Sequence, residues 1–495
     1  MANGRVVQTA DRTIGSRQLA ALLPPEVLAR PGYRSLADAL RTLLLDGRVA
    51  LHVRLPAERD LAEALGASRA TVTGAYDLLR ESGYVRSRRG SGTWTDLPEG
   101  HAPVGAHLLG GTGGYRPDGE DGLDLAIAAM GAPVDSLAEA LAWAAARLPR
   151  FARNPGYHPF GLPDLRTAIA DRFTRRGLAT HPGQILVTAG AQQAFALVVN
   201  LLCRPGDRVV TENPTYANAL DALRQARLRT GSIAVSDAGW DMEIAESTLR
   251  QTVPKLAYVI PDFHNPTGAL MPREQRLRLL AATRRTGTWL VVDETIADIA
   301  LDVPAPAPLP SLAPRGEADH VVVIGSLSKT HWGGLRVGWV RAAEKVITEL
   351  AAVRVAADMT GSVLDQLVAL PLLEGVERSL PIRLAELRSR REVLVRALEE
   401  HTPEWSWQVP PGGLSLWVDL GEPVSSALAE RAAAGGVHIG RGARFGVDPG
   451  TFEHRIRIPY TLPEDRLEEA VRRLAAAFHD GVPLAPSVDR PHWVA

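Results

Sequence analysis

The chain has 495 residues, of which 45% are hydrophobic and 22% charged, with a formal net charge of −1 at pH 7. This composition suits a globular protein long enough for at least two domains, and it excludes a protein that coats nucleic acid by bulk positive charge. The single cysteine, Cys203, excludes an internal disulfide framework and predicts a reducing, cytoplasmic location. We expect no membrane span, because Gly190 and Asn200 interrupt the most apolar window, residues 185–202. That window instead predicts a buried strand followed by a buried helix.

The first region with regular periodicity covers residues 30–95. The stretch YRSLADALRTLLLDGRVA repeats apolar residues at helical spacing and predicts a helix that ends near Gly47. In LPAERDLAEALGASRATV a second helix is predicted to begin within Pro56, Ala57 and Glu58. Gly66 then allows a tight turn, and Ser68 is a natural N-cap for a third helix. The following YVRSRRGSGTW predicts a β-hairpin with arginines near its tip. By periodicity alone this pattern suits a protein-contact domain as well as a DNA-binding module.

The sequence details favour DNA binding. The segments LPAERDLAEALGASRATV, AYDLLRESGYV and GSGTW closely resemble the winged helix-turn-helix of the GntR family. The resemblance implies that the third helix meets base edges and phosphates of a double-stranded DNA operator, while the hairpin lies against the phosphate backbone. The implied DNA contacts are Arg59, Ser68, Arg69, Thr71, Thr73 and the hairpin arginines Arg86, Arg88 and Arg89.

A composition change separates this region from the rest of the chain. Residues 96–122 are rich in Gly, Pro and Asp and predict a flexible linker. Residues 123–480 then alternate short Val- and Ile-rich runs with amphipathic helical stretches, which predicts an α/β domain with a mainly parallel sheet covered on both faces. The runs are QILVTAG, DRVVTE, LAYVIPD, TWLVVDE and HVVVIGS. Ligands of open α/β sheets bind at the carboxyl ends of strands, so functional side chains are expected directly after these runs.

The side chains found there suit a phosphorylated pyridine aldehyde. Lys329, one of three lysines in the chain, follows HVVVIGS and can form a Schiff base. Asp293 follows TWLVV, where a carboxylate can hold a pyridine nitrogen protonated. The other candidates are Ala191, Gln192, Ser326, Ser328 and Arg336 for the phosphate, Tyr216 for stacking on the ring, and Asn265 for the phenolic oxygen. Each alone has an ordinary structural explanation, such as a turn, a helix cap or a surface lysine.

Together and in this order, these features resemble the fold-type I pyridoxal-phosphate enzymes of the aspartate aminotransferase kind, over residues 123–480. The resemblance implies pyridoxal 5′-phosphate as cofactor, with Lys329 as the Schiff-base lysine, and a smaller C-terminal α+β domain. It also implies a homodimer in which Tyr157 reaches the phosphate of the neighbouring subunit's cofactor. Arg457 matches the arginine that pairs with a substrate carboxylate, and Arg455, two residues earlier on the same predicted strand, is the alternative.

One position departs from this family. A tyrosine usually follows the pyridine-binding aspartate by two or three residues, whereas DETIAD has Thr295 and Ile296 there. Loss of that hydroxyl is expected to change the electronics of the bound cofactor, which puts efficient transamination in doubt.

The combination of a GntR-type module and an aminotransferase-like domain resembles the MocR subfamily of GntR regulators. It implies a transcriptional regulator that senses a small amino compound, or pyridoxal phosphate itself, through Lys329. The alternative is an active aminotransferase that carries a DNA-binding domain. The histidines are dispersed along the chain, so no metal site is expected.

Overall fold

The computed structural model describes residues 13–88, 92–98, 123–314 and 316–480, with Arg88 described by its backbone alone. Contacts divide the chain into two compact units. The first unit comprises Met1–Ala106 with Gly446–Glu453, and the second comprises His107–Phe445 with His454–Ala495. The predicted linker lies almost entirely outside the described residues, as does Arg89.

The first unit contains the predicted helices and hairpin. Its elements are α1 (Ser16–Ala21), α2 (Pro25–Ala29), α3 (Tyr33–Leu45), α4 (Glu58–Leu65), α5 (Arg69–Glu81), β1 (Val85–Arg88) and β2 (Gly92–Thr95). Gly66 ends α4 in the left-handed conformation at a φ of 61°, and the Ser68 hydroxyl caps α5 by accepting a hydrogen bond from the Thr71 amide at 3.0 Å. The strands β1 and β2 pair in antiparallel fashion. The winged helix-turn-helix prediction is therefore confirmed.

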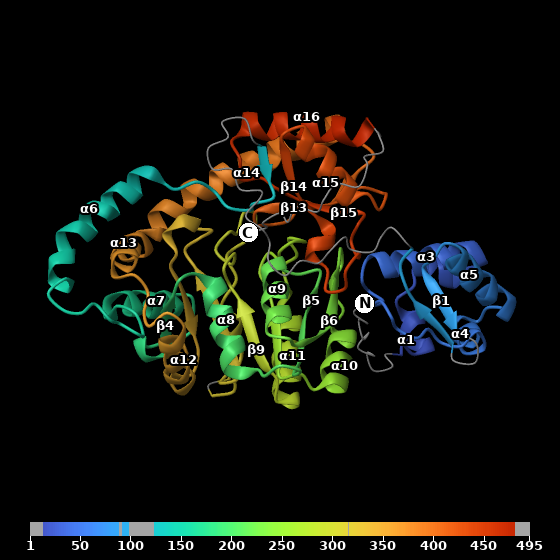
Figure 1. The fold of residues 1–495 in the computed structure, drawn as a ribbon, viewed down its shortest axis with the longest axis horizontal. Helices are drawn as coiled ribbons and strands as arrows, with labels where there is room; N and C mark the ends of the chain where they lie inside the picture. Colours follow the sequence, from blue (N-terminus) through green and yellow to red (C-terminus); the bar gives the residue numbers. More distant parts are fainter. Residues whose placement is uncertain (1–12, 89–91, 99–122, 315, 481–495) are drawn as a thin grey trace, which may run out of the picture. The chain divides into compact units, whose positions relative to one another are not determined.

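The second unit is built on one large sheet (Figure 1). Among the described residues its eight strands follow the order β4-β11-β10-β9-β8-β5-β6-β7. These strands are β4 (Ile185–Thr188), β5 (Arg208–Asn213), β6 (Arg229–Ser236), β7 (Gly239–Trp240), β8 (Leu256–Val259), β9 (Trp289–Asp293), β10 (Val321–Ser326) and β11 (Gly338–Arg341). The central pairs from β10 to β6 are parallel, and β11 and β7 are antiparallel to their neighbours. The predicted mainly parallel sheet is thus confirmed.

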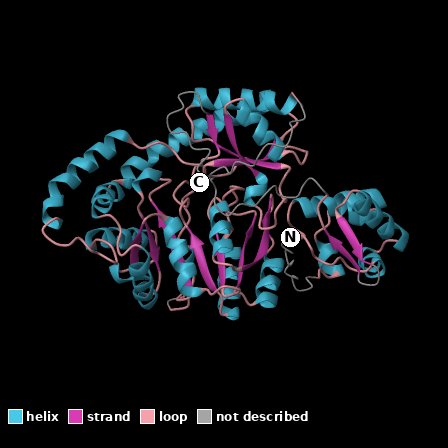
Figure 2. Cartoon of the chain, in the orientation of Figure 1, coloured by secondary structure: helices cyan, strands magenta, loops and turns pink. Residues whose placement is uncertain are grey.

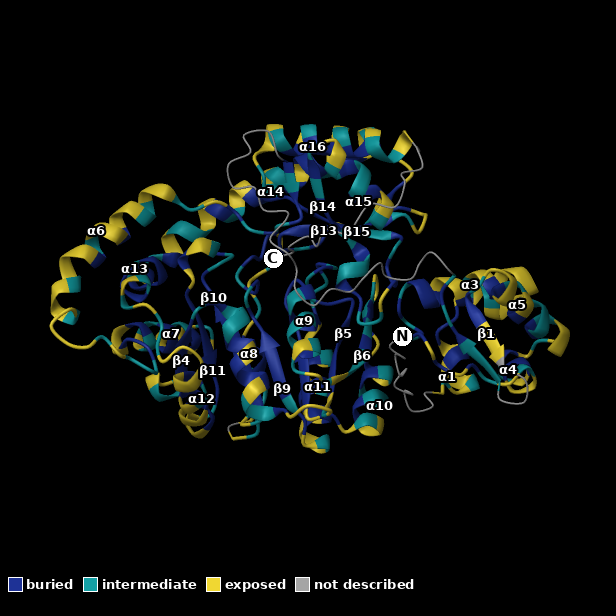
Figure 3. Cartoon of the chain, in the orientation of Figure 1, coloured by how far each residue is buried: buried dark blue, intermediate teal, exposed yellow. Residues whose placement is uncertain are grey.

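Helices cover both faces of this sheet, and its strands β4, β8, β9, β10 and β11 are almost entirely buried (Figure 3). On β9, the side chain of Val291 joins one apolar core, whereas those of Leu290 and Val292 join the other, as strand alternation requires. One core includes residues of α8 (Ala191–Leu202), α9 (Ala217–Gln225) and α12 (Glu344–Ala357). The other includes residues of α6 (Val134–Phe151), α7 (Pro163–Arg175), α10 (Met242–Thr252), α11 (Arg273–Thr286) and α13 (Val363–Glu374).

A smaller α+β domain completes the second unit, with helices packed on one side of a second sheet (Figure 2). Its described strands follow the order β12-β13-β15-β14-β3, and only the β14–β3 pair is parallel. The strands are β3 (Leu123–Leu125), β12 (Ser406–Trp407), β13 (Ser415–Asp419), β14 (Val437–Arg441) and β15 (Arg455–Pro459). The helices are α14 (Val376–His401), α15 (Ser425–Ala434) and α16 (Glu464–His479). Within the described part of the chain, no helix is long and apolar enough to span a membrane.

Candidate functional site

The strands of the large sheet that are followed by predicted site residues point in one direction. Strands β5, β8, β9 and β10 are mutually parallel, and β4 shares their direction because it is antiparallel to β11, which is antiparallel to β10. Their carboxyl ends therefore meet at one edge of the sheet. A cavity at this edge is lined by Ala128, Phe263, His264, Asn265, Gly268, Ile296, Lys329, Leu414 and Ser415.

Lys329 is held at this cavity by the backbone oxygen of Ala128, which accepts a hydrogen bond from Nζ at 2.9 Å. Burial, together with the positive charges of Arg457 and Arg336, lowers the pKa of Lys329 to about 8, while Asp293 acts in the opposite direction. A substantial fraction of the amine is therefore neutral near physiological pH. A neutral lysine amine is the form that attacks an aldehyde carbon.

The carboxylate of Asp293 lies at the end of β9 and has both oxygens occupied. Oδ1 accepts a hydrogen bond from the Thr295 amide at 2.9 Å, and Oδ2 accepts one from the Tyr258 hydroxyl at 2.8 Å. Burial raises the pKa of Asp293, although these hydrogen bonds and the charge of Lys329 oppose the shift. Such an aspartate is positioned to pair with a protonated ring nitrogen. Tyr258 was not among the residues singled out from the sequence.

The turn between β4 and α8, residues 188–192, is here called the β4–α8 turn and has the donor groups that an anion site requires. It leads into the N-terminus of α8, whose first amides, including those of Ala191 and Gln192, have no partner within the helix. Gly190 takes a φ of 88°, and a Cβ there would lie 2.8 Å from Nη2 of Arg336. Arg336 itself donates to the Ala189 oxygen at 2.6 Å. Glycine is required for the guanidinium to approach this turn so closely.

Two serines lie at the end of β10. The Ser326 hydroxyl donates to the Val337 oxygen at 3.1 Å and accepts from the Ser328 amide at 3.1 Å. Together with Arg336 and the α8 N-terminus, they provide a cationic group, hydroxyls and free amides, which is the donor set that a phosphate monoester needs. The residues present therefore fit the phosphate of the predicted cofactor.

Tyr216, Asn265 and Arg457 form the remaining part of the site. Tyr216 precedes α9 and its hydroxyl accepts from Asn218 at 2.9 Å. Arg457 on β15 is completely buried, and its Nη1 donates to Oδ1 of Asn265 at 3.1 Å, while Nη2 donates to the Ala126 oxygen. Burial lowers the pKa of Arg457 to about 10.

Arg455 and Arg457 have different surroundings although both lie on β15. Arg455 pairs with Asp237 at 3.1 Å and with Asp419 at 3.2 Å. Arg457 instead reaches the asparagine that follows β8 and packs over the Phe445 ring, with 5.1 Å between the guanidinium carbon and the ring centroid. Of the two arginines, Arg457 is thus the one beside the cavity that Asn265 and Lys329 line.

Tyr157 is separate from this group. It precedes α7 in a loop of residues 157–162, and its side chain is 62% exposed.

Among the described residues, no group of three or more His, Cys, Asp or Glu side chains gathers where it could hold a metal ion.

The predicted DNA contacts lie around the start of α5. Arg59, Ser68 and Arg69 are exposed, and Thr71 and Thr73 are half-buried. Glu58 was not predicted: its Oε2 accepts from the Thr73 hydroxyl at 2.9 Å and lies 3.4 Å from the Arg69 guanidinium.

In the hairpin, Arg86 pairs with Asp96 at 2.5 Å. The predicted contact of the Arg88 side chain, like that of Arg89, lies outside the described residues.

Comparison with known proteins identifies both parts of the chain. Residues 32–94 match the gntR family of bacterial regulatory proteins, and residues 122–474, more than half of the chain, match aminotransferase class I and II. The probable rhizopine catabolism regulatory protein MocR of Rhizobium meliloti is 32% identical over 328 residues, which cover 65% of this chain and 65% of that protein. The chain belongs to the aminotransferase class I and II family, and it joins this domain to a gntR-family domain at residues 32–94.

A second regulator and a solved aminotransferase are also similar to the chain. The HTH-type transcriptional regulator YisV of Bacillus subtilis is 27% identical over 437 residues, covering 81% of this chain and 87% of the regulator. The α-aminoadipate aminotransferase LysN of Thermus thermophilus, solved with N-(5′-phosphopyridoxyl)-L-leucine, shares 28% identity at a TM-score of 0.68, covering 73% of this chain and 93% of LysN. This chain is therefore a DNA-binding transcriptional regulator whose cofactor is pyridoxal 5′-phosphate.

Proposed function

We propose that the chain acts as a homodimer that senses a small amino compound at Lys329 and transmits its binding to the DNA-binding unit. The observation that carries this proposal is the position of the Lys329 amine, which lines a cavity, has a pKa lowered to about 8, and donates a hydrogen bond to the Ala128 oxygen. A lysine that holds an aldehyde carbon as a Schiff base can pass it to an incoming amine, so it is suited to detecting an amino ligand.

Different side chains around Lys329 would bind different parts of the cofactor. Pyridoxal phosphate supplies an aldehyde carbon that reacts reversibly with amines. Asp293, fixed by Tyr258 and the Thr295 amide, would hold the ring nitrogen protonated. Arg336, Ser326, Ser328 and the first amides of α8 would bind the phosphate, with Tyr216 against the ring and Asn265 at the phenolic oxygen.

The effector is proposed to carry a carboxylate as well as an amine. Arg457 is buried and already bonded to Asn265, so its planar guanidinium is oriented for a bidentate partner in the cavity. Arg455 is excluded from this role by its two aspartate partners. An amino acid bound between Lys329 and Arg457 would therefore contact both domains of the second unit, because Lys329 follows β10 and Arg457 lies on β15.

Sensing is favoured over turnover by the residue at position 296. Ile296 lines the cavity where the aminotransferase family usually has a tyrosine, so this side chain offers no hydroxyl to the phenolic oxygen.

The homodimer is supported by Tyr157, whose 62% exposed side chain is available to a second subunit. For the effector to alter DNA binding, the dimer must be able to adopt two arrangements, and the effector must bind these with different affinities.

The test is a visible-absorbance titration of the protein with pyridoxal phosphate and then with candidate amino acids and amines. Wild type and Lys345→Ala, an exposed lysine as matched control, should develop a band from lysine-bound cofactor that Lys329→Ala lacks. The ligand that shifts the band should also change operator affinity. Steady formation of a keto product would make catalysis the primary role, and operator affinity that responds to cofactor alone would make pyridoxal phosphate the effector. Absence of the band in wild type would refute the role of Lys329.

A further inference from the structure

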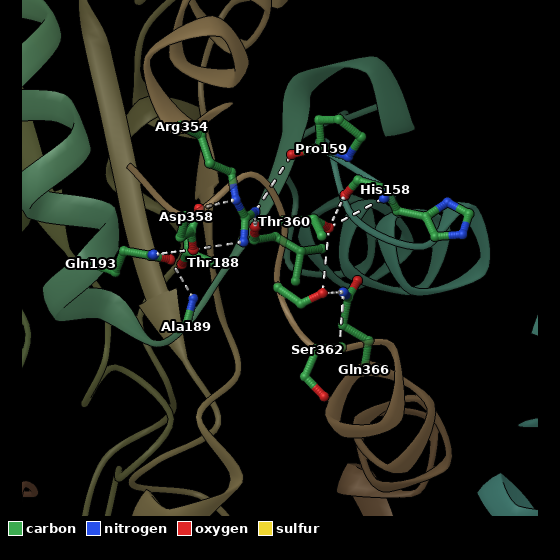
Figure 4. Close-up of polar contacts among 12 residues, drawn as sticks. His158, Pro159, Thr188, Ala189, Gln193, Arg354, Asp358, Thr360, Ser362 and Gln366 are labelled. Atoms are coloured by element: carbon green, nitrogen blue, oxygen red, sulfur yellow. Dashed lines mark hydrogen bonds and ion pairs between the residues drawn. The ribbon is translucent and has the colours of Figure 1, made fainter. Parts of the chain in front are cut away.

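An ion pair between a completely buried arginine and a more exposed aspartate lies next to the β4–α8 turn (Figure 4). Arg354 on α12 is 0% exposed, and its Nε lies 3.0 Å from Oδ1 of Asp358. Its Nη1 donates to the Val187 oxygen at the end of β4 and, at 3.5 Å, to the Pro159 oxygen. Burying a guanidinium costs several kcal/mol of desolvation unless partners of good geometry offset it. The pair is not part of the cavity that Lys329 lines, so a different role must account for it.

Hydrogen bonds lead from this pair to the backbone of the turn. Oδ2 of Asp358 accepts from Nε2 of Gln193 at 2.5 Å, and Oε1 of the same glutamine accepts from the Ala189 amide at 2.7 Å. The Ala189 oxygen accepts from Arg336 at 2.6 Å. Both backbone polar groups of Ala189 therefore have partners. Its amide is linked to Arg354 through the side chains of Gln193 and Asp358, and its carbonyl accepts from Arg336, the arginine proposed to bind phosphate.

This fixation matters because the next residue is conformationally free. Gly190 adopts a φ of 88°, and glycine reaches this region without steric cost, so its peptide groups can also rotate to other conformations. Rotation there would turn the first amides of α8 away from a bound anion. Asp358 could not hold Gln193 alone, because an unpaired carboxylate beside an anion site would repel the ligand. Arg354 neutralises that carboxylate and fixes its orientation.

The same cluster also holds the Tyr157 loop, residues 157–162. The Thr360 hydroxyl donates to the His158 oxygen at 2.8 Å and accepts from the His158 amide at 3.2 Å. The Leu162 amide donates to Oε1 of Gln366 at 2.7 Å. The loop is pressed against β4, since a Cβ on Gly161 would lie 2.4 Å from the Val187 side chain. The turn and the loop therefore share one support.

We propose that Arg354 and Asp358 are positioning residues for the cofactor phosphate, acting through Gln193 on the β4–α8 turn and joining that turn to the Tyr157 loop. The proposal rests on the proposed cofactor site. Because the pair supports the turn and not the Lys329 cavity, its effect is confined to ligands that carry a phosphate. In a dimer where Tyr157 meets the neighbour's cofactor, the same pair would link the two phosphate sites.

The experiment compares two aldehydes, pyridoxal 5′-phosphate and pyridoxal, which lacks the phosphate. Arg354→Gln should weaken binding of pyridoxal phosphate by about tenfold or more, as expected for a charged hydrogen-bond network, and leave pyridoxal binding within about twofold. Arg391→Gln is the matched control, since Arg391 is also buried and paired with an aspartate, Asp302, at 2.6 Å. Equal losses for both aldehydes, or the same loss in the control, would overturn the proposal.

Gln193→Leu provides a second test that leaves the Arg354–Asp358 ion pair intact. It should reproduce the phosphate-specific loss, and the double variant with Arg354→Gln should lose little more than either single variant, because both interrupt one chain of hydrogen bonds. Additive losses would contradict that chain.

Amide hydrogen exchange at Ala189 in the cofactor-free protein gives a readout that needs no ligand. It should be slow in wild type and faster in both single variants, and unchanged exchange would overturn the inference. If wild type bound neither aldehyde, the proposed cofactor site would be wrong, while exchange at Ala189 would still decide whether Arg354 holds the turn.

Discussion

The hydroxyl of Tyr258 on β8 donates a hydrogen bond to Oδ2 of Asp293 on the neighbouring strand β9, over 2.8 Å. Burial raises the pKa of the tyrosine well above its ordinary value, and the adjacent carboxylate raises it further. The phenol therefore stays protonated and the direction of the bond is fixed. A tyrosine hydroxyl thus reaches the site of this chain from an adjacent strand, to the aspartate, although Thr295 and Ile296 follow that aspartate in sequence.

Tyr258→Phe should weaken the binding of pyridoxal phosphate. Removing a donor that favours the charged carboxylate raises the pKa of Asp293 further and weakens its pairing with the ring nitrogen. A hydrogen bond to a charged group contributes about 1.5–3 kcal/mol, so the dissociation constant should rise by roughly tenfold or more. The measurement is an absorbance titration with the cofactor. Tyr76→Phe, which removes a hydrogen bond to the Pro56 oxygen in the first unit, is the control and should leave affinity unchanged. Equal effects of the two changes would rule out a specific role for Tyr258.

Cofactor uptake should depend on pH through Lys329. With a pKa of about 8, the reactive neutral amine should increase about tenfold between pH 7 and pH 9 and then level off, whereas a lysine at its ordinary pKa would give a rise of roughly a hundredfold. Stopped-flow absorbance of cofactor-free protein mixed with pyridoxal phosphate measures this rise. Arg457→Met removes a positive charge that lowers the pKa, so its midpoint should move to higher pH. A midpoint above pH 10 in wild type would contradict the electrostatic account.

Arg457→Met should also abolish discrimination between an amino-acid effector and the same compound without its carboxylate. Breaking a buried charge pair costs about 2–5 kcal/mol, so amino-acid affinity should fall by about 30-fold or more while the decarboxylated amine is little affected. Spectral titration of the cofactor-loaded protein with both ligands measures the two affinities. Arg455→Met removes an arginine of the same strand that pairs with Asp237 and Asp419, and should preserve the discrimination. Equal losses for both ligands would show that Arg457 does not bind the carboxylate.

Arg69→Ala should weaken operator binding without affecting the cofactor band. Its side chain is 73% exposed at the first position of α5, where a recognition helix meets DNA. The expected loss is about 1–3 kcal/mol, and the dependence of affinity on salt should fall by about one ion if the contact is to phosphate. Fluorescence anisotropy at several salt concentrations measures both quantities. Arg285→Ala, an exposed arginine of α11, is the control, and a loss no larger than in this control would remove Arg69 from the DNA interface.

The order of strands and helices could be predicted because it depends on local patterns. The runs ending at Thr188, Asp293 and Ser326 are continuously apolar, and a strand buried on both faces requires that pattern. Gly66 and Ser68 identified the turn and the cap of the DNA-binding helix for equally local reasons, a left-handed φ and a hydroxyl facing free amides. Site residues that directly follow strands, such as Lys329, could be found in the same way.

The residues that support the site could not be found from local sequence patterns. Tyr258 occupies the middle of an apolar run and Arg354 lies within a helix, and neither position has a local pattern that points to the site. Their partners are determined by the pairing of β8 with β9 and by the packing of α12 near the end of β4. Arg455 and Arg457 were likewise indistinguishable on one strand until Asp237 and Asp419 were found beside the first.

The sequence by itself determined the two folds, their order, and the chemical groups that follow the strands, because secondary structure and strand-end motifs depend on neighbours along the chain. Only the tertiary structure decided which buried polar groups meet: Tyr258 with Asp293, Arg457 with Asn265, and Arg354 with the backbone at Val187. A buried polar atom must find a partner, and in a folded sheet that partner comes from strands and helices far away in sequence.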